Sequence, residues 1–164
     1  MPKIDDRTSA VTSTPPASSD QAVTHFASLL AYESDCWDVH DGLNAGRPDF
    51  VLLDVRSPEL FAAGHIEGAV NLPHGRIVER NVAAYPPDTI FVTYCNGPHC
   101  NGADKGALRL AKLGRPVKKM IGGVTGWIDE GFTLTPPEST PLENSGPEGT
   151  PPESTPSDET SEQR

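Results

Sequence analysis

Long apolar runs are missing from this chain, and cysteines are few. No apolar stretch reaches the roughly 18 residues that a membrane-spanning helix needs, and the N-terminal segment lacks the apolar core of a signal peptide. The three cysteines, Cys36, Cys95 and Cys100, are an odd and sparse set, unlike the disulfide framework of a small secreted protein. We therefore expect a cytoplasmic protein that has no membrane partner.

Basic residues are also scarce, with 13 lysines and arginines against 23 acidic residues and a net charge of −10. The acidic balance, without a basic stripe interleaved with aromatics, excludes nucleic acid as a partner. The sign reverses between Asp104 and Met120, where six basic residues face one acid. This segment is either a solvated helix face or a positive field beside Cys95 that attracts a small anion.

Composition divides the chain into three parts. Residues 1–18 are rich in Ser, Thr, Pro and Asp, and predict a disordered segment. Residues 19–134 carry the apolar periodicity of a folded domain. Residues 135–164 form an acidic tail in which TPPESTP occurs twice, and we expect this tail to be disordered because it has almost nothing to bury.

Strands and helices alternate along the central part, which predicts an α/β domain with a parallel sheet. Residues 50–55 are apolar on both faces, as in a central strand covered by helices. Helices are expected from about 20 to 30, from 36 to 45, from 58 to 63, from 77 to 84 and from 103 to 113. Further strands are expected at 69–73, 89–94 and 117–121.

Cys95 ends one of these strands and precedes a Gly-Pro loop and a helix. Ligands of parallel sheets bind outside the carboxyl ends of the strands. Loop amides and a helix N-terminus at that place stabilise a thiolate or an anion. A buried, inert thiol is the alternative from position alone.

Four sequence blocks in register resemble the rhodanese superfamily over roughly residues 30–132. They are Asp54-Val55-Arg56-Ser57, then Gly64 to Pro73 (GHIEGAVNLP), then Tyr94-Cys95, then Gly122-Gly123 to Gly126-Trp127. The resemblance implies a rhodanese-like domain with about five mostly parallel strands and helices on both faces. It also implies a sulfurtransferase, of the thiosulfate:cyanide type or a persulfide carrier, that transfers sulfane sulfur through a persulfide on Cys95.

The implied site is the loop after Cys95. We expect substrate to be bound mainly by backbone amides of the loop residues Asn96, Gly97, His99, Cys100, Asn101 and Gly102. Asp54, Arg56 and Lys105 are expected to support the site. The donor would be a small sulfur-containing anion or a persulfide, and the acceptor a thiol or a protein. The loop lacks the arginine that many relatives carry, which argues against a phosphatase and disfavours thiosulfate.

Three alternatives concern the role of Cys100, a metal site and catalysis. Cys100 is either a thiol that resolves a modified Cys95 or a spectator, and we expect two free thiols because an anion-binding loop turns its side chains outward. The two thiols and the imidazole of Cys95, His99 and Cys100 also invite a zinc site, but no second ligand pair follows, so we expect no metal and no cofactor. The alternative to an enzyme is a non-catalytic interaction or redox-sensing module.

Overall fold

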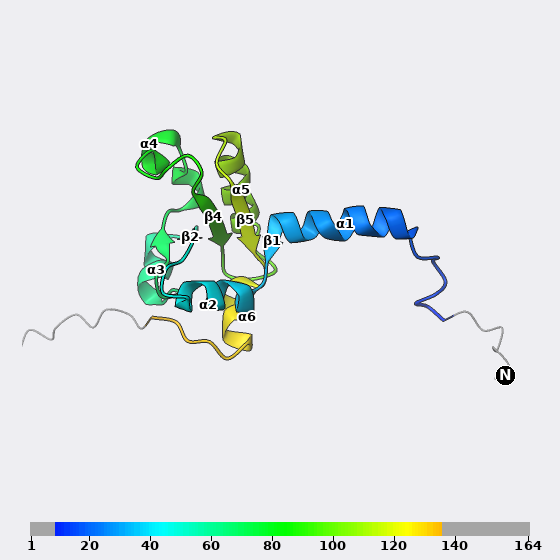
Figure 1. Ribbon diagram of the computed structural model, residues 1–164. Helices are drawn as coiled ribbons and strands as arrows, with labels where there is room; N and C mark the ends of the chain where they lie inside the picture. The colour runs from blue at the N-terminus through cyan, green and yellow to red at the C-terminus, as the bar shows by residue number, and fades with distance from the viewer. Residues whose placement is uncertain (1–8, 136–164) are drawn as a thin grey trace, which may run out of the picture.

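The computed structural model describes residues 9–135 and contains one five-stranded parallel sheet (Figure 1). The strand order is β1-β5-β4-β2-β3. The two longest strands are β4, at the centre, and β2, beside it. The strands are β1 (Glu33–Ser34), β2 (Phe50–Asp54), β3 (Val70–Asn71), β4 (Ile90–Tyr94) and β5 (Val117–Met120).

Six α-helices and one 3₁₀ helix are described around the sheet. They are α1 (Ser19–Tyr32), α2 (Cys36–Asn44), α3 (Pro58–Ala63), η1 (His74–Arg76), α4 (Glu79–Val82), α5 (Gly102–Lys112) and α6 (Gly123–Asp129). Local signals start several of them: Ser18, Asp35 and Ser57 accept hydrogen bonds from the first-turn amides of α1, α2 and α3.

Alternate residues of the central strands enter two separate cores. Leu52, Val92 and Tyr94 pack with α2 and α6 on one face of the sheet. Leu53 and Phe91, of opposite parity, pack with α5 and the segment around α4 on the other face. The predicted α/β fold, a parallel sheet with helices on both faces, is therefore confirmed.

The structure differs from the prediction around α4 and at β1. The helix expected at 77–84 is reduced to Glu79–Val82, because Ile77 and Val78 are extended and Ile77 is buried against α5 and the sheet. The short strand β1 was not predicted, since a two-residue strand is defined only by its pairing with Lys119 and Met120 of β5.

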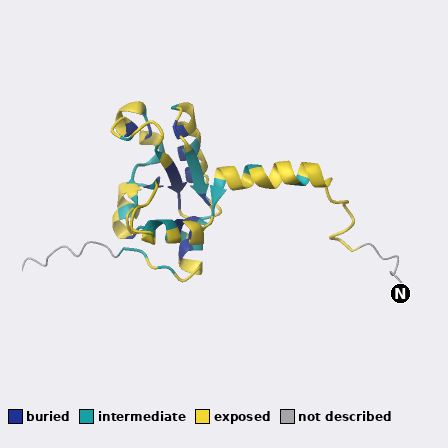
Figure 2. Ribbon diagram, in the orientation of Figure 1, coloured by how far each residue is buried: buried dark blue, intermediate teal, exposed yellow. Residues whose placement is uncertain are grey.

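The helix α1 projects away from the domain and none of its residues is buried (Figures 1 and 2). No helix within residues 9–135 has the length and apolar character to cross a bilayer. Residues 1–8 and 136–164 lie outside the described residues. The predicted disorder of the acidic tail, and of most of the N-terminal segment, therefore stays a prediction.

Candidate active site

Cys95 follows the last residue of β4 and continues the parity of Phe91 and Thr93, so its side chain lies on the α5 side of the sheet. The hydroxyl of Thr93 donates a hydrogen bond of 3.0 Å to the carbonyl oxygen of Ala103 in the first turn of α5. This contact fixes the start of α5 beside the strand end. The sulfur of Cys95 therefore lies next to a helix N-terminus, as predicted from the sequence.

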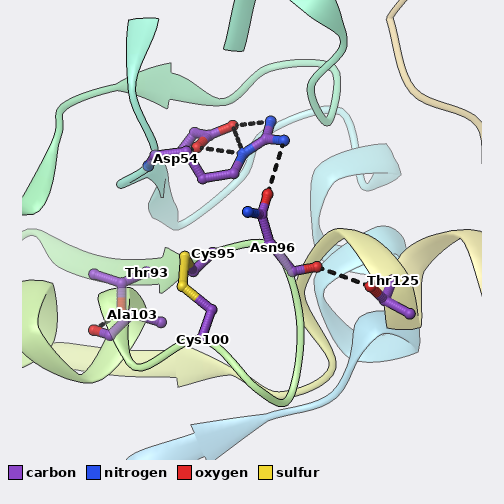
Figure 3. Close-up of a disulfide and its surroundings, with 8 residues drawn as sticks. Asp54, Thr93, Cys95, Asn96, Cys100, Ala103 and Thr125 are labelled. Carbon is purple, nitrogen blue, oxygen red and sulfur yellow. Dashed lines mark hydrogen bonds and ion pairs between the residues drawn. A yellow bond between two sulfur atoms is a disulfide. The ribbon is translucent and has the colours of Figure 1, made fainter. Parts of the chain in front are cut away.

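Cys95 and Cys100 are joined by a disulfide, with their Cα atoms 6.3 Å apart (Figure 3). Our expectation of two free thiols is wrong for this state of the molecule. The amide of Cys100 donates to the carbonyl of Gly97 at 3.0 Å, so the loop closes as a turn and brings Cys100 back toward Cys95. That amide is used within the loop, which removes one of the predicted anion donors.

The loop after Cys95 is held from outside by the first turn of α6. The amides of Val124 and Thr125 donate to the carbonyls of Cys95 and Asn96 at 3.0 and 2.8 Å, and the Thr125 hydroxyl adds a third bond to Asn96 (Figure 3). Gly123 has a φ of 60°, and a Cβ there would overlap the Cys95 carbonyl oxygen. The glycine therefore permits the close approach of these two segments.

A buried ion pair lies at the end of β2, beside the same loop. The guanidinium of Arg56 contacts both carboxylate oxygens of Asp54 at 2.6 to 3.1 Å and donates to the carbonyl of Gly64. Burial lowers the pKa of Arg56, but the hydrogen bonds and charge of Asp54 outweigh it and raise the value. Arg56 also approaches the side-chain oxygen of Asn96 within 3.5 Å. Asp54 and Arg56 thus lie beside the loop, and their support of the site stays a prediction.

A cavity of about 220 Å³ adjoins the disulfide. Cys95, Gly97 and Cys100 line one side of it, and Asp104 and Lys119 line another. The Lys119 ammonium lies 2.9 Å from Asp104 and 3.1 Å from Glu33. The hydrogen bond to Asp104 raises the pKa of Lys119, so the group is a cation already neutralised by two carboxylates.

The predicted loop residues separate into two groups. Gly97 and Cys100 line the cavity, and Gly102 packs against both sulfurs, since a Cβ there would lie 2.8 Å from the Cys95 sulfur. The side chain of Asn96 instead reaches toward Arg56. His99 and Asn101 are exposed and do not line this cavity. Substrate binding by these residues stays a prediction.

Support of the site by Lys105 stays a prediction. Lys105 is exposed on α5 and is not among the lining residues, whereas Lys119 is. Lys119 belongs to the basic segment between Asp104 and Met120 but was not predicted as a site residue, although its position near the carboxyl end of β5 was a usable signal. Within residues 9–135, no group of three or more His, Cys, Asp or Glu side chains is placed to hold a metal ion.

Comparison with known proteins agrees with this geometry. Residues 35–130 match the model of the rhodanese-like domain. The chain is 38% identical over 90 residues to the HTH-type transcriptional regulator Rv0324 of Mycobacterium tuberculosis, covering 51% of this chain and 39% of that protein. It is 40% identical over 55 residues to the thiosulfate sulfurtransferase PspE of Escherichia coli, covering 32% of this chain and 52% of that one.

A solved structure is similar to this chain over more residues than the two curated relatives are. The BH2092 protein of Bacillus halodurans superimposes with a TM-score of 0.69 and 33% identity, over 71% of this chain and 85% of that one. The chain spans about two fifths to one half of the length of the two curated relatives named above. The family match covers more than half of the chain, and the blocks around Arg56, Cys95 and Trp127 lie within it. On this evidence the chain belongs to the rhodanese-like family.

Proposed function

We propose that this protein is a sulfurtransferase that carries sulfane sulfur as a persulfide on Cys95. The observation that carries the proposal is the place of Cys95, at the end of β4, beside both a cavity and the N-terminus of α5. No side chain within the described residues caps the first turn of α5, so its amides are available to an anion. The sulfurtransferase relative supports the same chemistry.

The reaction begins with reduction of the disulfide, in which a dithiol is oxidised and both cysteines become thiols. The Cys95 thiolate then attacks the outer sulfur of the donor, and the remainder of the donor leaves with the electron pair of the broken S–S bond. With thiosulfate the leaving group is sulfite. An acceptor nucleophile such as cyanide or a thiolate next attacks the outer sulfur of the persulfide, and the Cys95 thiolate is released.

The charges around the cavity favour a persulfide donor over thiosulfate. Lys119 is paired with two carboxylates, and Arg56 is committed to Asp54, so neither is an unpaired cation for a dianion. A singly charged or neutral donor meets less repulsion from Asp104. The cycle needs a thiol reductant, which suits the cytoplasmic location that we predicted.

The test uses intact-mass spectrometry of the full chain after reduction and removal of the reductant. In a Cys100→Ser background, incubation with a small organic persulfide should add about 32 Da, the mass of one sulfur on a thiol. Adding Cys95→Ser to the same background gives the control, which should gain nothing. Absence of the adduct with both persulfide and thiosulfate would overturn the proposal.

A second candidate is the redox-sensing module. The disulfide favours it, because oxidation occupies the nucleophile. The relative named as a transcriptional regulator supports a regulatory role for such a domain. This candidate predicts reversible closure of the disulfide by mild oxidants without any sulfur adduct in the Cys100→Ser variant, so the same measurement separates the two functions.

A further inference from the structure

Cys95 and Cys100 are held together by the loop and by the helix that follows it. The turn formed by the Cys100 amide and the Gly97 carbonyl sets the distance between the two residues. Gly102 then leaves room for both sulfurs, since a Cβ there would lie 2.8 Å from one sulfur and 3.4 Å from the other. After reduction, the Cys100 sulfur therefore starts within bonding reach of the Cys95 sulfur.

We propose that Cys100 is a second catalytic residue that discharges the Cys95 persulfide within the molecule and releases its outer sulfur as sulfide. The proposal rests on the persulfide chemistry proposed above and adds an activity to it. The Cys100 thiolate attacks the inner sulfur of the persulfide, which is the Cys95 Sγ atom. The bond between Sγ and the outer sulfur breaks, hydrosulfide leaves with the electron pair, and the disulfide seen in the structure forms.

The step is balanced without any other reactant. The persulfide Cys95–S–SH and the Cys100 thiolate give the disulfide and HS⁻, so atoms and charge are conserved. The outer sulfur is reduced by two electrons, and each of the two cysteine sulfurs is oxidised by one. A dithiol then reduces the disulfide and restores both thiols, so the complete cycle reduces sulfane sulfur to sulfide at the expense of a dithiol.

The surroundings of the two sulfurs suit hydrosulfide as a leaving group. The outer sulfur has a place to leave to, because the cavity of about 220 Å³ touches both cysteines. The uncapped first turn of α5 begins at Gly102, against the two sulfurs, and the positive end of a helix dipole stabilises an anion there. The buried residues Ala103 and Met120 also line the cavity and shield it on the protein side.

The remaining cysteine offers a matched control. Cys36 is a free thiol buried in the core on the α2 and α6 face, and its Sγ donates to the carbonyl of Ile121 at 3.4 Å. Burial raises the pKa of Cys36 to about 11, so this thiol remains protonated near neutral pH. Cys36 does not itself line the cavity, so its removal tests the loss of a cysteine outside the reacting pair.

The experiment is a single turnover without an acceptor. The full chain is reduced, freed of reductant and mixed with one equivalent of a small organic persulfide. Wild-type protein should release about one sulfide per chain and end about 2 Da lighter than the reduced form, as a disulfide does. Cys100→Ser should keep an adduct of about 32 Da on Cys95 and release at least tenfold less sulfide. Cys36→Ser should behave as wild type.

The outcomes distinguish this inference from the function on which it rests. A wild-type protein that holds a stable adduct beside an unreacted Cys100 would overturn the role of Cys100 and leave the sulfurtransferase standing. Sulfide release from Cys100→Ser at the wild-type rate would do the same. Absence of the adduct in both proteins would overturn both proposals. Thermal melts of the reduced variants, and a Cys100→Ala variant, separate these results from misfolding.

Discussion

The hydroxyl of Tyr94, the residue before Cys95, donates a hydrogen bond of 2.7 Å to the carboxylate of Asp54. The same carboxylate holds Arg56, so one buried acid joins the ends of β2 and β4. Burial and the charge of Asp54 raise the pKa of the Tyr94 phenol, which therefore remains a neutral donor. This network positions the strand end from which Cys95, the proposed nucleophile, follows.

Removing the acid from this network should be costly. We expect Asp54→Asn to lower the free energy of unfolding by about 3–5 kcal/mol, because it leaves a buried guanidinium without its counter-charge. Urea denaturation measures the change. Glu79→Gln is the matched control, since Glu79 is exposed and lies 3.4 Å from Arg115, and its loss should cost under about 1 kcal/mol. Equal effects of the two changes would contradict the role given to Asp54.

The second prediction concerns the glycine beneath the two sulfurs. A Cβ at Gly102 would lie 2.8 Å from the Cys95 sulfur. Gly102→Ala should therefore displace that sulfur and slow closure of the disulfide at least tenfold. The free energy of unfolding of the reduced protein should fall by no more than about 1 kcal/mol, because the higher helix propensity of alanine offsets part of the clash. Thiol titration against time measures closure. Gly75→Ala, where nothing lies within 4 Å of the added carbon, should leave the rate unchanged.

The third prediction concerns the charge beside the cavity. Lys119→Met leaves Asp104 and Glu33 without their cation, so loading of Cys95 by thiosulfate should fall about fivefold, which corresponds to about 1 kcal/mol. Asp104→Asn should raise it. Loading by a neutral polysulfide should change less than twofold in either variant. Lys118→Met is the control, as Lys118 does not line the cavity. An equal loss with both donors would show that Lys119 acts on the fold and not on the donor.

The fourth prediction follows from the buried thiol of Cys36. Its pKa rises from 9.0 to about 11 in the folded protein, chiefly through burial. As the pH rises, the unfolded chain therefore releases this proton at a lower pH than the folded protein does. The stability that the neutral thiol contributes is complete below pH 9 and declines between pH 9 and 11. The decline should amount to roughly 2–3 kcal/mol. Denaturation of oxidised wild type and oxidised Cys36→Ser across this range should show a shallower slope for the variant.

Local sequence determined much of the fold. The caps Ser18, Asp35 and Ser57 and the two-faced apolar strands at residues 50–54 and 90–94 act within a few residues of one another. Such signals can be recognised without knowing the fold. The placement of Cys95 at a strand end follows from the same signals, since the carboxyl ends of parallel strands share one edge of the sheet. The position of Asp54 and Arg56 at the same edge follows for the same reason.

Contacts between distant segments decided the rest. Strand β1 is defined by its pairing with β5. The helix expected at residues 77–84 begins only at Glu79, because Ile77 is extended and buried. Lys119, and not Lys105, lines the cavity because pairing of β5 with β4 sets its place at the site. The bond between Cys95 and Cys100 depends on a turn and on the space above Gly102. Sequence spacing predicts which residues can meet, but only packing fixes the direction of each side chain.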